Sequence, residues 1–78
     1  QELWVQFADK EAFFNEEDAL KGILTSYPGK NPVVIYCKTE RAVNRLGRDY
    51  MVSGDENLLF DLEKRYGKEN IRVRSLGI

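Results

Sequence analysis

The chain has 78 residues, of which 42% are hydrophobic and 32% are charged, and its formal net charge is -1. A chain of this length supports one domain with a modest core, and its composition argues against a disordered or a membrane protein. It contains one cysteine and no histidine, which excludes an internal disulfide, imidazole catalysis and the usual zinc-ligand sets. No apolar run approaches the roughly eighteen residues of a membrane span, and no signal sequence opens the chain, so we expect a cytoplasmic protein.

The charges are unevenly distributed along the chain. Residues 1–20 carry six acids against one base, residues 21–48 carry one acid against six bases, and residues 49–78 are nearly balanced. Such an asymmetry favours electrostatic orientation toward a partner, but it is weaker than the basic footprint of a stand-alone nucleic-acid binder. The chain begins at Gln1 rather than at a methionine, and we therefore expect a domain excised from a larger protein.

The first predicted element is a strand over residues 2–7. Its side chains alternate, with Leu3, Val5 and Phe7 on one side and Trp4 and Gln6 on the other. This period of two is typical of a half-buried strand. The three apolar residues are predicted to face the core, which leaves Trp4 on the opposite face.

A helix is predicted after Asn15, which can cap it with Asp18 at the third position. An apolar stripe at spacings of three and four follows, and it consists of Leu20, Ile23, Leu24 and Tyr27. Gly22 lies within this segment, which predicts either a loose turn or close packing of the backbone against the sheet. Pro28 and Gly29 are predicted to end the helix.

Two further strands are predicted in the middle of the chain. Residues 32–37 form a continuous apolar run rich in β-branched side chains, which indicates a central strand. Its core-facing residues are predicted to be Val33, Ile35 and Cys37. Tyr36 then falls on the opposite face, and a hairpin turn over residues 38–40 leads to a more polar strand over residues 41–46.

The second helix is predicted over residues 54–66. Ser53 and Glu56 have the spacing of a capping box. The apolar stripe that follows consists of Leu58, Leu59, Leu62 and Tyr66. Gly67 can supply the left-handed cap, and the alternation of residues 70–74 predicts a last strand. The residues of this strand that are predicted to be buried are Ile71 and Val73.

The predicted order of elements is β-α-β-β-α-β. This order matches the split βαβ, or ferredoxin-like, arrangement within the α+β class. We therefore expect a four-stranded antiparallel sheet with both helices on one face, and a second face that no helix covers.

The residue types offer no catalytic, cofactor or metal site. No nucleophile has a matching base, and no glycine-rich phosphate loop is present. The acidic cluster at residues 16–18 raises the alternative of a cation site, but adjacent helical positions point in different directions, and complementation of the helix dipole is favoured. Cys37 allows a redox thiol as an alternative, although a cysteine in a central strand is typically a small core residue.

Aromatic and arginine side chains outside the predicted core suggest a binding surface. The candidate partner-binding residues are Trp4, Tyr36, Phe60, Arg41, Arg45, Arg72 and Arg74. A face that combines cations with stacking rings also suits single-stranded nucleic acid, although the stacking motifs of RNA-recognition domains are absent. The alternatives to nucleic-acid binding are a solvated charged face or a face covered by the parent protein.

Six segments carry a resemblance to a known family: LWVQF (3–7), YPG (27–29), PVVIY (32–36), RDYMV (48–52), NLL (57–59) and GKENIRV (67–73). Together they resemble the extreme C-terminal domain of bacterial DNA polymerase III alpha subunits. The resemblance covers nearly the whole chain, but its motifs are turn residues and apolar positions rather than a catalytic signature.

This resemblance implies that residues 1–78 are a single C-terminal accessory domain of a DNA-directed DNA polymerase, a nucleotidyltransferase whose metal-binding aspartates lie in a separate domain. It also implies docking to the tau subunit of the clamp loader or to another replisome protein. A clamp-binding peptide is not assigned to residues 1–4 or 75–78, and no single residue inherits the contact with tau. The leading hypothesis is a non-catalytic protein-protein interaction module, and the alternative is a nucleic-acid contact module; neither involves a membrane.

Overall fold

A computed structural model describes residues 1–75 of the chain. Residues 76–78 belong to the closing segment 75–78, to which no clamp-binding peptide was assigned, and they lie outside the described residues. The elements follow in the order β1 (Glu2–Phe7), α1 (Lys10–Thr25), β2 (Pro28–Asn31), β3 (Val33–Cys37), β4 (Ala42–Arg45), η1 (Arg48–Tyr50), α2 (Glu56–Tyr66), η2 (Lys68–Asn70) and β5 (Ile71–Arg74). Both η elements are single 3₁₀ turns. Within residues 1–75, no helix has the length and apolar character needed to cross a bilayer.

The described residues form one four-stranded sheet in the order β4-β3-β1-β5. β1 pairs in parallel with β3 and antiparallel with β5, and β3 pairs antiparallel with β4. The predicted α+β class is therefore confirmed, but the prediction of a wholly antiparallel, ferredoxin-like sheet is wrong. β1 and β3 are direct neighbours, so the βαβ unit is not split by another strand. Consecutive strands tend to lie side by side, and a helical connection allows them to run parallel.

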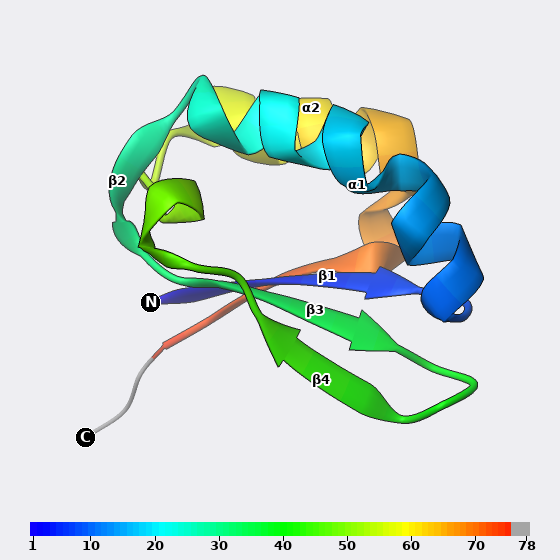
Figure 1. Ribbon diagram of the computed structural model, residues 1–78. Coiled ribbons are helices and arrows are strands. Elements are labelled where there is room, and N and C mark those ends of the chain that lie inside the picture. Colours follow the sequence, from blue (N-terminus) through cyan, green and yellow to red (C-terminus); the bar gives the residue numbers. More distant parts are fainter. Residues whose placement is uncertain (76–78) are drawn as a thin grey trace.

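Both helices lie on the same face of the sheet, as predicted (Figure 1). The core fills the space between the two layers, and alternate residues of β1 and β3 point into it. Its buried members are Leu3, Val5, Phe7, Phe13, Leu20, Leu24, Val33, Ile35, Cys37, Val52, Leu58, Leu62 and Ile71. The predicted core-facing residues of β1 and β3 are thereby confirmed.

α1 begins earlier than the sequence predicted. The Asp9 carboxylate accepts a hydrogen bond from the Ala12 backbone N–H at 2.8 Å, so Asp9 is the N-cap and the predicted cap at Asn15 is wrong. The earlier start adds Phe13 to the buried stripe of this helix, seven residues before Leu20. A Cβ atom at Gly22 would meet nothing within 4 Å, so the close-packing alternative for this glycine is also wrong.

α2 begins two residues later than predicted and ends at Tyr66 as predicted. Asp55 rather than Ser53 caps it, because the Asp55 carboxylate accepts from the Asn57 N–H at 2.8 Å. The Ser53 hydroxyl instead accepts from the Asp55 N–H at 3.3 Å and thus supports the preceding turn. Gly67 has a φ of 93°, a value that favours glycine at this helix end.

Three further details differ from the sequence prediction. β2, which was not predicted, forms isolated bridges to Val52. β4 begins at Ala42 because Arg41 has a φ of 53° and belongs to the hairpin turn. Val73 is 46% exposed rather than buried. It pairs with Leu3 on the core-facing side of the sheet, but β5 is an edge strand with a neighbour on one side only.

Substitution of two glycines by alanine should change stability in opposite directions. A Cβ at Gly29 would overlap the backbone of Ser53, so Gly29→Ala should lower the free energy of unfolding by about 1–3 kcal/mol. Gly22→Ala places its methyl in open space within α1 and should raise that free energy by about 0.5–1 kcal/mol. Urea denaturation of the two variants checks both values, and a destabilised Gly22→Ala together with a neutral Gly29→Ala would contradict this packing.

Candidate functional site

The face of the sheet opposite the helices carries the candidate site, and we call it the open face. Alternation along the strands places on it Glu2, Trp4, Gln6, Val34, Tyr36, Val43, Arg45, Arg72 and Arg74. The strand register brings Trp4 of β1 beside Val34 of β3 and Arg72 of β5. Tyr36 lies between Gln6 and Val43. The two aromatic side chains are half-buried.

Glu2 connects the charged and aromatic groups of the open face. Its Oε1 accepts a hydrogen bond from the Trp4 indole Nε1–H at 3.1 Å, and its Oε2 lies 2.5 Å from Nη2 of Arg45. The pKa of the Glu2 carboxyl lies below its ordinary value of 4.5. The hydrogen bond from Trp4 is the larger cause of this lower pKa, and the pairing with Arg45 is a smaller one. The Arg74 guanidinium lies 5.1 Å from the ring centroid of Trp4, within the range of a cation–π contact. The indole is therefore held in place by its neighbours.

A small pocket lies next to Trp4. Its volume is about 140 Å³, and its lining residues are Trp4, Gln6, Tyr36, Glu69, Asn70 and Arg72. The Gln6 Nε2 donates to the Asn70 Oδ1 at 3.1 Å, and the Asn70 Nδ2 donates to the Tyr66 carbonyl at 2.7 Å. Because typical small-molecule sites have volumes of roughly 300–1,000 Å³, this pocket suits one side chain of a partner better than a metabolite.

Val34 gives the open face an apolar layer of its own. Its side chain is fully buried, yet it does not belong to the core between the sheet and the helices. Its neighbours across the strands are Trp4 and Arg45, and Tyr36 lies two residues further along the same strand. These larger side chains cover it, so the open face is a packed surface rather than a loose set of solvated residues.

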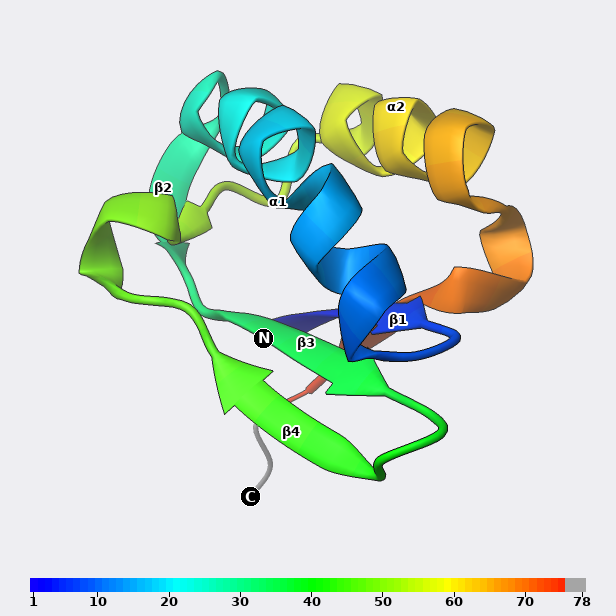
Figure 2. The same ribbon diagram turned by 45° about the vertical axis from the view of Figure 1, so that its right-hand side comes forward.

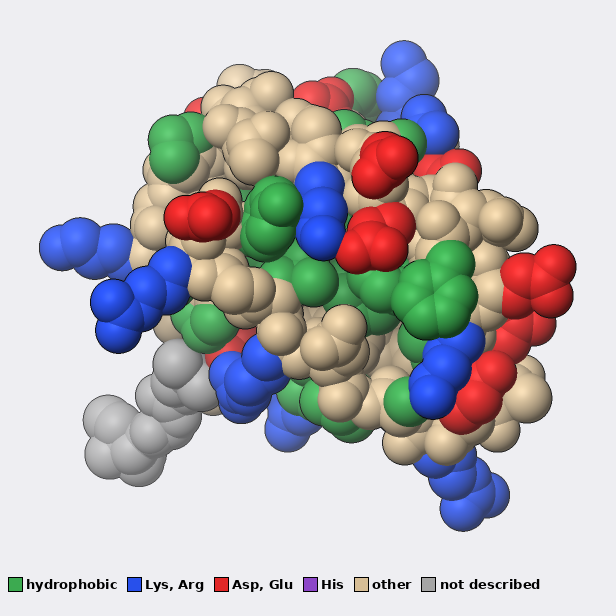
Figure 3. All heavy atoms as spheres, in the orientation of Figure 1, with side chains coloured by type: hydrophobic (Ala, Val, Ile, Leu, Met, Phe, Trp, Pro, Cys, Tyr) green, Lys and Arg blue, Asp and Glu red, His purple; other side chains and the backbone are tan. Residues whose placement is uncertain are grey.

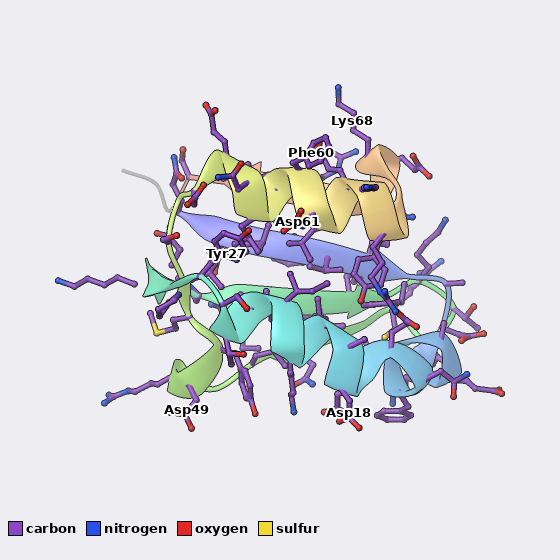
Figure 4. The ribbon with its side chains drawn as sticks, turned by 90° about the horizontal axis from the view of Figure 1, so that it is seen from above. Asp18, Tyr27, Asp49, Phe60, Asp61 and Lys68 are labelled. Carbon is purple, nitrogen blue, oxygen red and sulfur yellow. The ribbon has the colours of Figure 1, made fainter. Side chains whose placement is uncertain are left out.

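The structure brings most of the predicted binding residues together on this face. Besides Trp4 and Tyr36, it places there Arg45, Arg72 and Arg74. Phe60 is 63% exposed but lies on α2 in the helical layer (Figure 4), away from the other candidates. Arg41 is exposed and lies in the hairpin turn before β4, because its left-handed backbone conformation removes it from the strand.

Three polar residues of the site, Glu2, Gln6 and Asn70, were not among the predicted binding residues. The alternation of β1 did place Gln6 on the face of Trp4, and the same period of two could have placed Glu2 there. Asn70 reaches the pocket from the end of η2, and its contact with Gln6 joins positions 64 residues apart. No local pattern indicates such a contact.

The other groups that the sequence analysis considered do not converge on a reactive centre. Burial raises the pKa of the Cys37 thiol, and this cysteine is a core residue as predicted. Glu16 pairs with Arg65 at 2.8 Å, while Glu17 pairs with Lys21 at 2.7 Å, so these neighbouring carboxylates point toward different cations. Among residues 1–75, no three carboxylate or thiol groups are arranged to hold a metal ion.

Charges of both signs are mixed on the side of the molecule seen in Figure 3, where lysine and arginine side chains lie next to aspartate and glutamate. That side therefore lacks the continuous basic stripe of a nucleic-acid footprint. Comparison of the chain with known protein families, curated proteins and solved structures found no match.

The contacts of Glu2 predict an effect of pH on stability. A carboxyl whose pKa is lower in the folded protein stabilises the fold at pH values above its unfolded pKa, and this contribution disappears as the pH falls through the folded pKa. Glu2→Gln should therefore destabilise the protein most above pH 4.5, and its difference from the wild type should shrink at lower pH.

Urea denaturation at pH values from about 7 to about 3 measures this difference. Asp49→Asn, in the exposed turn η1, is the control and should shift the free energy of unfolding by less than about 0.5 kcal/mol. A Glu2→Gln effect that is independent of pH would contradict the proposed role of this carboxylate.

Proposed function

We propose that this chain is a non-catalytic protein-protein interaction module that docks through the open face of its sheet. The observation that carries the proposal is the position of both helices on the opposite face, which leaves Trp4 and Tyr36 half-buried beside arginines. Tryptophan, tyrosine and arginine are enriched among the residues that dominate binding at protein interfaces. Trp4 and Tyr36 would serve as anchors, and Arg72 would contribute from the rim of the small pocket.

The resemblance of the sequence suggests the parent and the partner. We propose that the module is the C-terminal domain of a bacterial DNA polymerase III alpha subunit, a cytoplasmic enzyme of DNA replication whose catalytic domain lies elsewhere. Its partner would then be the tau subunit of the clamp loader or another replisome protein. Apolar side chains of the partner would cover Tyr36 and the exposed part of Trp4.

The open face suits a protein better than a nucleic acid. Arg45 is already paired with the Glu2 carboxylate, and Arg74 already lies against the ring of Trp4. Binding to single-stranded nucleic acid requires cations available for phosphates and rings available for stacking. Here Arg45, Arg74 and the ring of Trp4 already have partners within the chain, and nucleic-acid contact is the alternative that the experiment must distinguish.

Two substitutions on the open face test the proposal against tau protein from the same organism. Trp4→Ala and Tyr36→Ala should each weaken binding by at least about tenfold, because each removes an anchor from the centre of the interface. Phe60→Ala is the matched control, since it also removes an exposed aromatic ring, but from α2. Isothermal titration calorimetry measures the three affinities relative to the wild type.

The alternative function is tested by titration with a single-stranded oligonucleotide at two salt concentrations. Affinity that falls steeply with salt, together with no association with tau or the sliding clamp, would overturn the proposal in favour of a nucleic-acid contact module. Equal losses of tau binding in the Phe60→Ala and Trp4→Ala variants would also contradict docking through the open face.

A further inference from the structure

β4 forms a free edge of the sheet, with only β3 beside it (Figure 2). The Leu46 N–H donates to the Val33 carbonyl at 3.0 Å. Since hydrogen-bonded and non-hydrogen-bonded pairs alternate in an antiparallel ladder, Asn44 and Ala42 also face β3 with their backbone groups. The N–H and C=O groups of Val43 and Arg45 consequently point away from β3, toward the free edge.

An apolar groove runs along the helix side of this edge. It has a volume of about 290 Å³, and residues that line it include Lys10, Phe13, Phe14, Cys37, Ala42 and Val43. Phe14 is 63% exposed and Val43 is 57% exposed. Two of the most exposed large hydrophobic side chains therefore flank the same strand edge, one from the first turns of α1 and one from β4.

The segment from the β4 hairpin to η1 carries more cations than acids. Residues 38–48 contain Lys38, Arg41, Arg45 and Arg48 against the single acid Glu40, while Arg45 is paired with Glu2 and the acids Asp9, Glu11 and Asp49 lie in the adjoining segments. The neighbouring acid Glu40 accepts a hydrogen bond from the Lys10 backbone N–H at 3.1 Å. A second copy of this chain would bring like charges together across the edge, whereas an acidic segment would complement them.

We propose that the edge of β4 binds an extended, acidic segment of a partner protein, which adds to the sheet as a further strand. The backbone of the segment pairs with the outward groups of Val43 and Arg45. Apolar side chains on one side of the segment enter the groove beside Phe14, and acidic side chains lie near Arg41 and Arg48. This site uses the edge backbone of Val43 and Arg45, whose side chains belong to the open face, and it goes beyond the function proposed above.

A library of random peptides of about nine residues, a length that spans the edge strand and its flanks, is selected on the 78-residue chain. The selected peptides should alternate apolar with acidic residues. When such a peptide binds, hydrogen exchange at the backbone amides of Val43 and Arg45 should slow by at least about tenfold, because strand addition removes both amides from water.

Val43→Pro and Val43→Thr form a matched pair that tests the backbone contact. Proline removes an N–H that does not bond to β3, and edge strands tolerate such a change, so affinity for the selected peptides should fall by at least about tenfold. Threonine keeps both the N–H and the branched side chain, so its affinity should fall much less than that of Val43→Pro. Arg41→Glu should weaken binding of the acidic peptides.

Several outcomes would overturn the proposal. These are the selection of no peptide, selected peptides without acidic residues, or peptides that leave the Val43 and Arg45 amides unprotected. Protection of both amides in a dimer without peptide would assign the edge to a second copy instead. If circular dichroism shows that Val43→Pro is unfolded, amide protection in the wild type together with the affinity of Arg41→Glu decides the result.

Discussion

The parallel pairing of β1 with β3 is the constraint on which the rest of the architecture depends. Parallel neighbours cannot be joined by a tight turn, so the chain between them must cross over the sheet, and α1 makes that crossing. α2 lies on the same face before the chain returns to the other edge of β1 as β5. Because both connections lie on one side, the core forms there and the second face is left without a helix.

The open face gains its order from one carboxylate. Glu2 accepts a hydrogen bond from the indole N–H of Trp4 and pairs with the guanidinium of Arg45, and Arg74 on the neighbouring strand β5 lies against the ring of Trp4. Side chains that are already held in one arrangement lose less conformational entropy when a partner binds. The same contacts engage Arg45 and Arg74, two cations that a phosphate backbone would need, and this links the local geometry to the proposal of a protein partner.

Local patterns predicted what depends on local chemistry. The period of two placed Trp4 and Tyr36 opposite the core, and the apolar stripe of α2 was correct up to its end at Tyr66. The strand order could not be predicted in this way, because it depends on which distant strands pair, and the same order of elements is compatible with several sheets. The start of α1 was predicted too late because both Asp9 and Asn15 are residue types that cap helices well, and it is the hydrogen bond from the Ala12 N–H that identifies Asp9 as the cap. Arg41 left the site through a single backbone conformation that its own residue type does not indicate.

Accessibility of the two faces of the sheet tests the central claim most directly. In a nuclear magnetic resonance experiment, addition of a soluble paramagnetic agent should make the ring protons of Trp4 and Tyr36 relax markedly faster than they do without the agent. The methyl groups of Leu20 and Leu24, which lie between the sheet and the helices, should be almost unaffected. If the rings of Trp4 and Tyr36 are shielded in the free chain to the same extent as these leucine methyls, that result would contradict an open face and with it the proposed docking surface.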